Sequence, residues 1–449
     1  MRSRCQRAIG LVAMALAAGG CLSFNPANQP LERVDPDRGY RSEKNEIYRE
    51  RSDLWIILAF SGGGTRAAAF AYGVMEELRA TQVVIDGESI SLLDEVDTIS
   101  AVSGGSFPAA YYGLFGDRIF EDFEERFLRK NVQGALFLRA LHPWNLVRLM
   151  TPLLSRTDLA SRYYDKHIFE GSTFADLVEA KAPRIHINAT DLTRGNRFTF
   201  TQGGFDLICS DLDPFPISSA VAASSAVPVL LSPLTLENYG GGCGFEVPDW
   251  FSRALQSRAT HPRRYEVARS IDQYLEPDAK RYIHLVDGGI SDNLGLRLPI
   301  ERTALLGKKL QKQIFDIEPP RQLVIIAVNA AVDPDPAIDL SYAAPSLAMS
   351  LNLSSGAQIR RYNFETLELA RTAVDDWTQE FSQDTDEPVT GYFIEVSFDL
   401  LPDEEDRRYF NRLPTSFKLS DEQVDRLRDA GRTILRNSAE FQELLGELR

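Results

Sequence analysis

The chain of 449 residues has no internal repeat and no long low-complexity tract, and it is poor in histidine, cysteine and positive charge. Its five histidines and four cysteines show no metal-ligand spacing, so the sequence predicts neither a metal nor another cofactor. The formal net charge of −15 would repel phosphates, which argues against a nucleic-acid-binding role. Hydrophobic residues make up 44% of the sequence, as in ordinary folded globular proteins.

The first twenty residues have no acidic side chain and only a short apolar run, Ile9 to Ala18, which cannot span a bilayer as a helix. Three arginines precede this run and small residues follow it up to Cys21, an order typical of a secretory signal peptide. A cysteine directly after small residues resembles a bacterial lipoprotein cleavage box, although Ala18 stands where that box usually has leucine. We expect residues 1–20 to be a signal peptide and Cys21 to carry lipid. A plain signal peptide cut nearby, or a short membrane anchor, is the alternative.

A lipidated Cys21 predicts an exported, membrane-anchored lipoprotein of the bacterial cell envelope, in the periplasm or at the outer membrane. The polar, proline-rich residues 21–50 would then form a tether. Cys209 and Cys243 remain after export, and an oxidising compartment permits either a disulfide between them or two unpaired thiols. The sequence gives no indication of the oligomeric state.

From residue 54 onward, short apolar runs alternate with segments of helical pattern. Strands are predicted at 54–60, 96–102, 184–189, 282–286, 322–328 and 392–398. Helices are predicted at 67–78, 218–227 and 338–372, and in an amphipathic segment that follows the capping box Ser420–Gln423. The alternation predicts an α/β fold whose mostly parallel central sheet is covered by helices on both faces. With no clear linker after residue 54, we expect one domain over 51–300 and a C-terminal extension, 301–449, packed on it.

The first of three candidate site motifs, Gly62-Gly63-Gly64-Thr65-Arg66, lies between a predicted strand and a predicted helix. Glycines let the backbone approach a ligand, and N–H groups at a helix N-terminus favour negative charge, either a phosphate or the oxyanion of an acyl-transfer intermediate. The motif also fits a dinucleotide-binding fingerprint, with Ala67 at its last position and Asp86 about 20 residues on. An exported protein meets little nicotinamide cofactor, however, and that interpretation leaves the other two motifs unexplained.

The second motif, Ala101-Val102-Ser103-Gly104-Gly105, and the third, Asp287-Gly288-Gly289, also follow predicted strands. A sharp turn between small residues would push the Ser103 hydroxyl out of the sheet as in a nucleophile elbow, although Ala101 replaces the usual first glycine. Alone, Ser103 would serve equally well as a helix cap, and Asp287 as part of an Asx turn. Because the carboxyl ends of parallel strands share one edge of a sheet, we expect hydroxyl, carboxylate and glycine amides to converge into a site for acyl transfer.

In this order, the three motifs resemble those of the patatin-like phospholipase family over about residues 54–300. Two further segments look similar, at 188–192 and 220–228, whereas Ala67 and Ala101 replace glycines common in the family. The resemblance implies a patatin-like serine hydrolase fold and a lipid acyl hydrolase of the phospholipase A or esterase type, acting on a lipid or phospholipid. It also implies a Ser–Asp dyad, in which Ser103 attacks the ester and Asp287 takes the hydroxyl proton.

The same resemblance assigns the oxyanion hole to the motif formed by Gly62, Gly63, Gly64 and Arg66, with Gly105, Gly288 and Gly289 supporting the other two motifs. We expect Arg66 to order the glycine loop or to offset nearby charge rather than to react directly. A conventional triad would need a histidine. His284 lies three residues before Asp287 on the same predicted strand, so its side chain should point to the opposite face.

Residues 126–156 contain six lysines or arginines and no acidic residue, together with many large apolar side chains. A basic, apolar segment suits an interfacial lid, and helices packed beside the core with solvated arginines are the alternative. Two other functions stay open for the whole chain. One is a non-catalytic envelope lipoprotein that binds lipid or partners, and the other is a nucleotide-binding oxidoreductase that uses the glycine loop.

Overall fold

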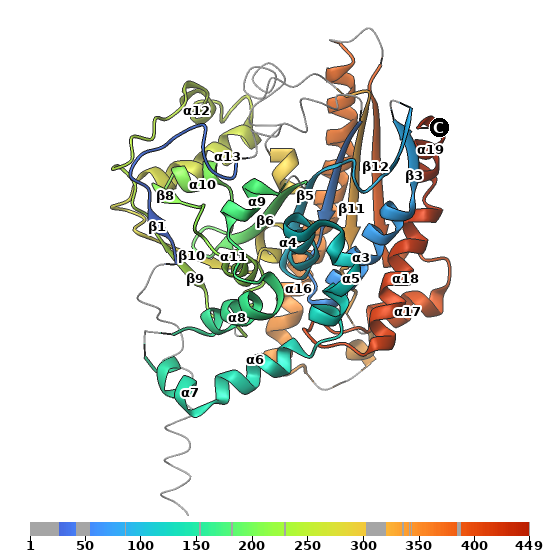
Figure 1. The fold of residues 1–449 in the computed structure, drawn as a ribbon, viewed down its shortest axis with the longest axis horizontal. Coiled ribbons are helices and arrows are strands. Elements are labelled where there is room, and N and C mark those ends of the chain that lie inside the picture. Colours follow the sequence, from blue (N-terminus) through green and yellow to red (C-terminus); the bar gives the residue numbers. More distant parts are fainter. Residues whose placement is uncertain are drawn as a thin grey trace, which may run out of the picture.

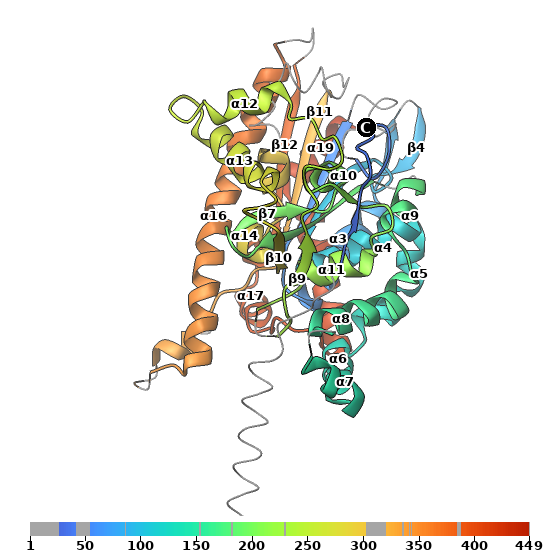
Figure 2. The same ribbon diagram turned by 90° about the vertical axis from the view of Figure 1, so that its left-hand side faces the viewer.

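The computed structural model of the chain describes residues 27–41, 54–85, 87–151, 154–180, 183–228, 230–301, 320–334, 336–340, 342, 344–383 and 388–448. Its centre is a mixed sheet with helices on both faces (Figures 1 and 2). The predicted signal peptide, Cys21 and Asp86 lie outside the described residues, so the lipid anchor stays a prediction. None of the described helices is both long and apolar enough to cross a membrane.

Five strands of the central sheet are parallel. In spatial order they are β12 (Thr390–Ser397), β11 (Gln322–Asn329), β2 (Leu54–Phe60), β5 (Val96–Val102) and β6 (Arg184–Asp191). Three shorter strands complete it through antiparallel pairs: β10 (Tyr282–Val286) with β6, β9 (Leu234–Glu237) with β10, and β7 (Asn196–Thr199) with β6. The prediction of a mostly parallel α/β sheet is confirmed, but the strand at 282–286 is not one of its parallel members.

The direction of β10 decides where its carboxyl end lies. Leu285 pairs with Asp191 and Val286 with Thr190, which are the last two residues of β6. Because the pair is antiparallel, β10 starts beyond the carboxyl edge of the parallel strands and runs inward, so its own carboxyl end stops at that edge. Asp287 therefore reaches the expected edge, although the parallel arrangement from which its position was predicted is wrong.

Alternate residues of β2 face two separate cores. Leu58 and Phe60 are fully buried with Phe70 of α3 (Thr65–Ala80) on one face. Ala59 is buried on the other face, under α16 (Leu347–Phe381). Burial of a large apolar side chain stabilises the fold by about 1.5–3 kcal/mol, so two covered faces make the strand a rigid support for the loop that follows it.

The C-terminal extension is part of the sheet rather than a layer packed on it. It supplies β11 and β12, and β11 pairs with β2 along its whole length. It also supplies α18 (Asp421–Asn437), which begins at the predicted capping box, where the side chains of Ser420 and Gln423 each bond the other's backbone N–H. This helix crosses α3 so closely that a Cβ on Gly73 would lie 2.2 Å from the carbonyl oxygen of Arg428. Residues beyond 301 thus complete the core beneath the glycine loop.

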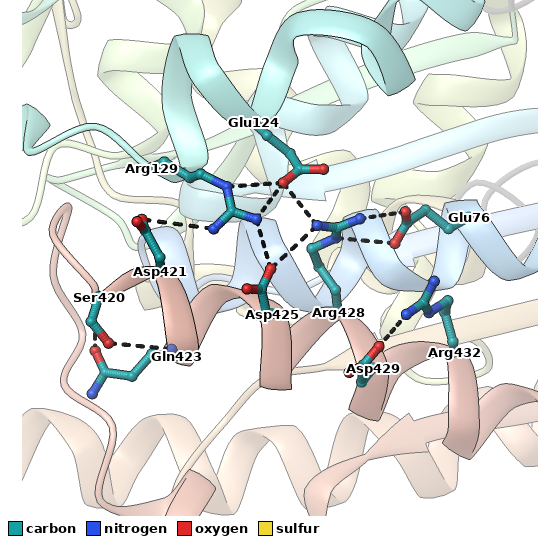
Figure 3. A network of polar contacts seen from close by, with 10 residues as sticks. All are labelled: Glu76, Glu124, Arg129, Ser420, Asp421, Gln423, Asp425, Arg428, Asp429 and Arg432. Atoms are coloured by element: carbon teal, nitrogen blue, oxygen red, sulfur yellow. Dashed lines mark hydrogen bonds and ion pairs between the residues drawn. The ribbon is translucent and has the colours of Figure 1, made fainter.

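An ion-pair network joins α18 to α3 and to the π-helical turn η3 (Glu124–Leu128), as Figure 3 shows. Arg428 lies 2.7 Å from Glu76 Oε1 and 2.8 Å from Glu124 Oε2. Arg129 contacts the same Glu124 oxygen at 2.7 Å and Asp425 Oδ1 at 2.6 Å. Because Arg428, Glu76 and Glu124 are mostly buried, removing one partner would leave charge away from water.

The other elements surround this core and connect its strands. The helices are α4 (Ser106–Phe115), α5 (Ile119–Phe123), α6 (Val132–Leu141), α7 (Pro143–Leu149), α8 (Arg156–Tyr164), α9 (Phe174–Glu179), α10 (Gln202–Asp206), α11 (Ile217–Ser224), α12 (Asp249–Leu255), α13 (Pro262–Asp272), α14 (Gly289–Asp292), α17 (Glu404–Asn411) and α19 (Ala439–Glu447). Short helical turns are η1 (Ser103–Gly105), η2 (Gly116–Arg118), η4 (Asp165–Phe169), η5 (Gln273–Leu275), η6 (Pro336–Leu340) and η7 (Phe398–Leu400). Two short antiparallel pairs lie apart from the main sheet: β1 (Gln29–Pro30) with β8 (Ser210–Asp211), which are distant in the sequence, and the hairpin of β3 (Gln82–Ile85) with β4 (Glu88–Ser91).

Residues 27–41 are not the free tether that was predicted for 21–50. Their strand β1 pairs with β8, and Arg41 forms a buried ion pair with Asp206 at 2.7 Å. Tyr40 is buried and its hydroxyl donates to Ile185 O at 3.1 Å. The tether prediction is wrong for these residues. It relied on their polar composition, and composition does not reveal that polar side chains such as Arg41 pair with the domain. The rest of 21–50 lies outside the described residues.

Cys209 and Cys243 form a disulfide, one of the two states that the sequence left open. The bridge also holds the N-terminal segment, since Leu31 N–H donates to Cys209 O at 2.7 Å and Val34 N–H donates to Cys243 O at 3.0 Å. Closing a separation of 34 residues stabilises a fold by about 3–4 kcal/mol in the chain-entropy account. The bridge therefore fixes the segment after α10 against the start of the described chain.

We predict that Arg428→Met lowers the free energy of unfolding by about 1–3 kcal/mol, because Glu76 and Glu124 lose a charged partner while they stay mostly buried. The matched control is Arg432→Met, one turn along α18, where Arg432 pairs with the exposed Asp429 (Figure 3). That change should cost less than about 0.5 kcal/mol. Chemical denaturation of both variants measures the difference, and equal losses would contradict the role given to the network.

Candidate active site

The side chains of Ser103 and Asp287 meet, although 184 positions separate them in the sequence. The Ser103 hydroxyl donates to Asp287 Oδ2 at 2.8 Å. Both residues are buried, at 5% and 8% exposure. A hydroxyl and a carboxylate in direct contact within a nearly dry site form the central pair expected for nucleophilic attack on a carbonyl.

Ser103 stands on a strained turn between β5 and α4. Its φ is 49°, a left-handed value that serine rarely adopts and that nucleophile elbows require. Two neighbouring serines hold the turn: Ser103 N–H donates to Ser224 Oγ at 2.8 Å, and Ser106 Oγ donates to Ser103 O at 2.5 Å. These bonds aim the hydroxyl at Asp287 and also occupy the amide of Ser103 itself.

Asp287 is fixed by bonds to both its backbone and its carboxylate. Thr190 Oγ1 donates to Asp287 O at 2.8 Å, and Gly289 N–H donates to Asp287 Oδ1 at 2.8 Å, which leaves Oδ2 for Ser103. Burial raises the pKa of Asp287 to about 6, against the lowering effect of the bonds from Gly289 and Ser103. The carboxylate is therefore a stronger base than an exposed aspartate and is still ionised at neutral pH.

The glycine loop lies directly on the serine turn. Gly64 has a φ of 63°, and a Cβ on Gly104 would lie 2.1 Å from Gly64 O, so side chains at these positions would push the two motifs apart. The third motif also packs closely, because a Cβ on Gly288 would lie 2.3 Å from Asn188 O of β6 and 2.9 Å from Val102 Cγ1 of the serine motif. Gly105 packs in the same way, with a Cβ position 2.7 Å from Phe60 Cβ. All three motifs thus converge as expected.

One predicted oxyanion donor is already in use. Gly62 N–H donates to Asn293 O at 2.9 Å, so the assignment of Gly62 to the oxyanion hole is contradicted. The structure gives the N–H groups of Gly63 and Gly64 no acceptor among the described residues. These two amides, at the N-terminus of α3, are therefore the candidates for binding an oxyanion.

Arg66 holds the loop from beneath. Its guanidinium donates to Ala330 O at 3.0 Å, to Leu413 O at 2.7 Å and to Thr415 Oγ1 at 3.1 Å. The side chain is 3% exposed, and burial lowers its pKa to about 10, which keeps it charged at neutral pH. These donors all point to the C-terminal extension, so Arg66 connects the glycine loop to it, in line with the expected ordering role. The guanidinium is not directed at an oxyanion near Ser103.

Three residues that position the site were missed as individuals in the sequence. Ser224 and Thr190 hold the backbones of Ser103 and Asp287, and both lie in segments noted only for their family likeness. Asn293 was not singled out. Its Oδ1 lies 2.7 Å from a Cβ built on Gly62 and 3.0 Å from one on Gly289, so its carboxamide sits between the glycine loop and the Asp287 turn. The available signal was its place in the first turn after Asp287-Gly288-Gly289.

His284 does not join the pair. Its side chain is exposed, and its Nδ1 lies 3.0 Å from Thr235 Oγ1 on the neighbouring strand β9. This agrees with the expectation that His284 faces away from Asp287. Within the described ranges, no group of three His, Cys, Asp or Glu side chains gathers in a way that would hold a metal ion.

The patatin-like phospholipase family model matches residues 58–300, which contain all three motifs. The chain belongs to this family. No curated protein matches the sequence.

Among solved structures, human GIVD cytosolic phospholipase A2 is 13% identical with a TM-score of 0.42, over 95% of this chain and 68% of that one. The same enzyme in complex with methyl gamma-linolenyl fluorophosphonate inhibitor and terbium chloride is also 13% identical, with a TM-score of 0.39 over 89% of this chain and 60% of that one. VipD from Legionella pneumophila is 12% identical, with a TM-score of 0.26 over 89% and 72%.

The position of Asp86 argues against the dinucleotide-binding interpretation of the patatin-like glycine loop. In a dinucleotide-binding unit the ribose-binding acid lies at the carboxyl end of the parallel strand beside the first one. Here that strand is β5, which pairs in parallel with β2, and the residue at its carboxyl end is Ser103. Asp86 instead lies in the sequence between β3 and β4, which pair with each other in a separate two-stranded sheet. The serine turn therefore stands where that fold would have its ribose-binding acid.

We predict that ester hydrolysis falls as the pH drops through about 6. A carboxylate can act as a base only when ionised, and burial raises the pKa of Asp287 to about 6, so we expect the rate to fall about tenfold per pH unit below that value. Burial also raises the pKa of Asp292 to about 6, so Asp292→Asn is the control and should keep the inflection. A profile of kcat/KM against pH measures both, and a rate that stays constant down to pH of about 4 would contradict the assignment.

Proposed function

We propose that this chain is a lipid acyl hydrolase of the phospholipase A or esterase type, with Ser103 as nucleophile and Asp287 as general base. Membership of the patatin-like phospholipase family supports hydrolysis of lipid acyl esters. The observation that carries the finer assignment is the 2.8 Å bond between the Ser103 hydroxyl and a buried carboxylate.

The geometry suggests a sequence of balanced proton transfers. Ser103 Oγ attacks the ester carbonyl while its proton passes to Asp287 Oδ2. The carbonyl oxygen becomes an oxyanion, for which the N–H groups of Gly63 and Gly64 are the donors. As the intermediate collapses, Asp287 returns the proton to the leaving alcohol. Water then attacks the acyl-enzyme and gives a proton to Asp287. When this second intermediate collapses, the bond to Ser103 Oγ breaks, Asp287 returns the proton to that oxygen, and the carboxylic acid is released.

The magnitudes assign most of the acceleration to the oxyanion donors. An aspartate with a pKa of about 6 is about two units more basic than an ordinary one, which is worth only about 3 kcal/mol in proton affinity. A serine hydroxyl is a far weaker acid than either. Each oxyanion donor contributes about 10²–10³ to kcat in comparable hydrolases, so Gly63 and Gly64 are as important to the proposal as the dyad.

Export remains part of the proposal. The signal-like N-terminus and the cysteine at position 21 suggest a lipid-anchored envelope protein. The disulfide between Cys209 and Cys243 supports an oxidising location, because such bonds persist mainly outside the cytosol. A lipid-anchored hydrolase would meet its substrate at the membrane surface that holds it.

We predict that Ser103→Ala and Asp287→Asn each lower kcat/KM for ester hydrolysis about 10³-fold or more, because each removes a group that acts in the transition state. The matched controls are Asp292→Asn, a second buried carboxylate, and His284→Ala, and both should keep most of the activity. Defined phospholipids and a neutral short-chain ester serve as substrates.

Labelling with a serine-reactive fluorophosphonate locates the nucleophile in the same set of proteins. The proposal requires labelling at Ser103 in the wild type and none in Ser103→Ala. A wild-type protein that takes up no label and hydrolyses none of these esters would favour the non-catalytic lipoprotein instead. Loss of activity in His284→Ala as deep as in Asp287→Asn would replace the dyad by a triad.

A further inference from the structure

The helices α6 and α7 expose an unusual number of large apolar side chains. The two helices project from the lower end of the body in both views (Figures 1 and 2). Six such residues within residues 137–150 are about half exposed or more: Phe137 (64%), Leu138 (70%), Leu141 (52%), Trp144 (70%), Val147 (61%) and Met150 (48%). We call this set the apolar arm surface. So many exposed apolar side chains within 14 residues are typical of an interaction site.

The arm, which consists of α6 and α7, is held by its own packing contacts. Leu149, Leu154 and Leu159 form their own small core, against which Ala140 packs, so α6, α7 and α8 share a cluster. The guanidinium of Arg139 lies over the ring of Tyr163, with its carbon Cζ 4.9 Å from the ring centroid. The arm therefore has inward-facing apolar residues that serve packing, and the exposed six are additional to them.

Both ends of the arm are joined to the proposed catalytic site. At its start, Gln133 N–H donates to Phe417 O at 3.2 Å, and the adjacent Ser416 accepts from Thr65 N–H in the glycine motif at 2.9 Å. At its end, Ser161 of α8 lies 2.9 Å, oxygen to oxygen, from Ser219 of α11. The helix α11 also carries Ser224, which holds the Ser103 amide. These contacts connect the arm to the glycine motif at one end and to the helix that holds the Ser103 amide at the other end.

The charge of the arm favours one class of partner. Residues 126–156 contain no acidic residue, in a chain whose net charge is −15. Arg126 and Arg129 are used in ion pairs within the protein. Arg139 lies on α6, where its guanidinium packs on Tyr163, Arg148 lies on α7, and Lys130 lies two residues before α6. Basic side chains that flank exposed aromatic and aliphatic ones are suited to a lipid surface with anionic headgroups, and Trp is favoured where a bilayer meets water.

We propose that the apolar arm surface inserts into the anionic face of a phospholipid bilayer and delivers the dyad to its substrate there. The proposal rests on the proposed function for its purpose, but membrane binding by the arm is measured separately from catalysis. Both interpretations of residues 126–156 describe part of the segment. Phe127, Leu128 and Val132 are buried in the main core, whereas the six residues of the apolar arm surface are exposed.

The experiment uses the full chain with Cys21→Ser, so that a lipid anchor does not dominate the measurement. Flotation with vesicles of phosphatidylcholine and phosphatidylglycerol measures membrane binding. The variant Phe137→Ser/Trp144→Ser should bind about tenfold less or weaker still, because it removes two large apolar anchors. The matched control is Phe364→Ser on α16, whose ring is exposed to the same extent, 63% against 64%, and this change should leave binding as it was.

A second pair of variants tests the charge. Lys130→Gln/Arg148→Gln should reduce binding to vesicles that contain phosphatidylglycerol severalfold and change binding to pure phosphatidylcholine little. A soluble short-chain ester needs no membrane, so its hydrolysis should change much less than vesicle binding in all arm variants. That assay also reports whether each variant is folded.

The outcomes separate this proposal from the proposed function. Ser103→Ala should bind vesicles like the parent, since the arm and not the nucleophile makes the contact. A parent that binds vesicles but hydrolyses no ester would sink the proposed function and leave the arm intact. Equal vesicle binding by the parent and by Phe137→Ser/Trp144→Ser would overturn the arm proposal. Failure of the parent to bind vesicles would also overturn the arm proposal. If light scattering shows a dimer of the parent that the arm variants abolish, the apolar arm surface binds a second copy of the chain, which would overturn the proposal as well.

Discussion

The hydrogen bond between Ser103 and Asp287 is the contact on which the interpretation of this fold depends. It places a carboxylate in a buried site where the described residues provide no cationic partner, and burial raises the pKa of that carboxylate and disfavours its charge. The bond from Gly289 N–H to the other carboxylate oxygen offsets part of that cost. The strain at Ser103 and the close approach of Gly104 to Gly64 serve the same end, because both bring the hydroxyl, the carboxylate and the loop amides together.

The surroundings of this contact come from the domain that carries the three motifs and from the C-terminal extension. The segment after β12 receives the guanidinium of Arg66 at Leu413 and Thr415, and its Ser416 carbonyl accepts the N–H that starts α3. The next residue, Phe417, bonds the start of α6. One short C-terminal segment therefore supports the glycine loop and the root of the apolar arm together. The ion pairs of Arg428 fix the helix that follows this segment to α3.

Much of the site could be predicted from local sequence, since each motif follows an apolar run and contains the small residues that a sharp turn requires. The direction of β10 could not, because YIHLV has the same pattern in a parallel or an antiparallel strand and only its distant partner β6 decides. The use of the Gly62 amide by Asn293 is equally non-local, with a partner more than 200 positions away. The placement of residues 27–41 on the domain depends on buried polar contacts such as Arg41 with Asp206, which composition does not reveal. The insertion of β11 beside β2 likewise follows from pairing across most of the chain.

The central claim is that hydroxyl, carboxylate and two loop amides surround a single carbonyl. The most direct test is a crystal structure of the protein after reaction with an alkyl fluorophosphonate, whose phosphorus imitates the tetrahedral carbon. The account predicts a bond from phosphorus to Ser103 Oγ, with the phosphoryl oxygen about 3 Å from the N–H groups of Gly63 and Gly64 and with Asp287 beside the serine oxygen. An adduct on another residue, or a phosphoryl oxygen directed away from both glycine amides, would contradict it.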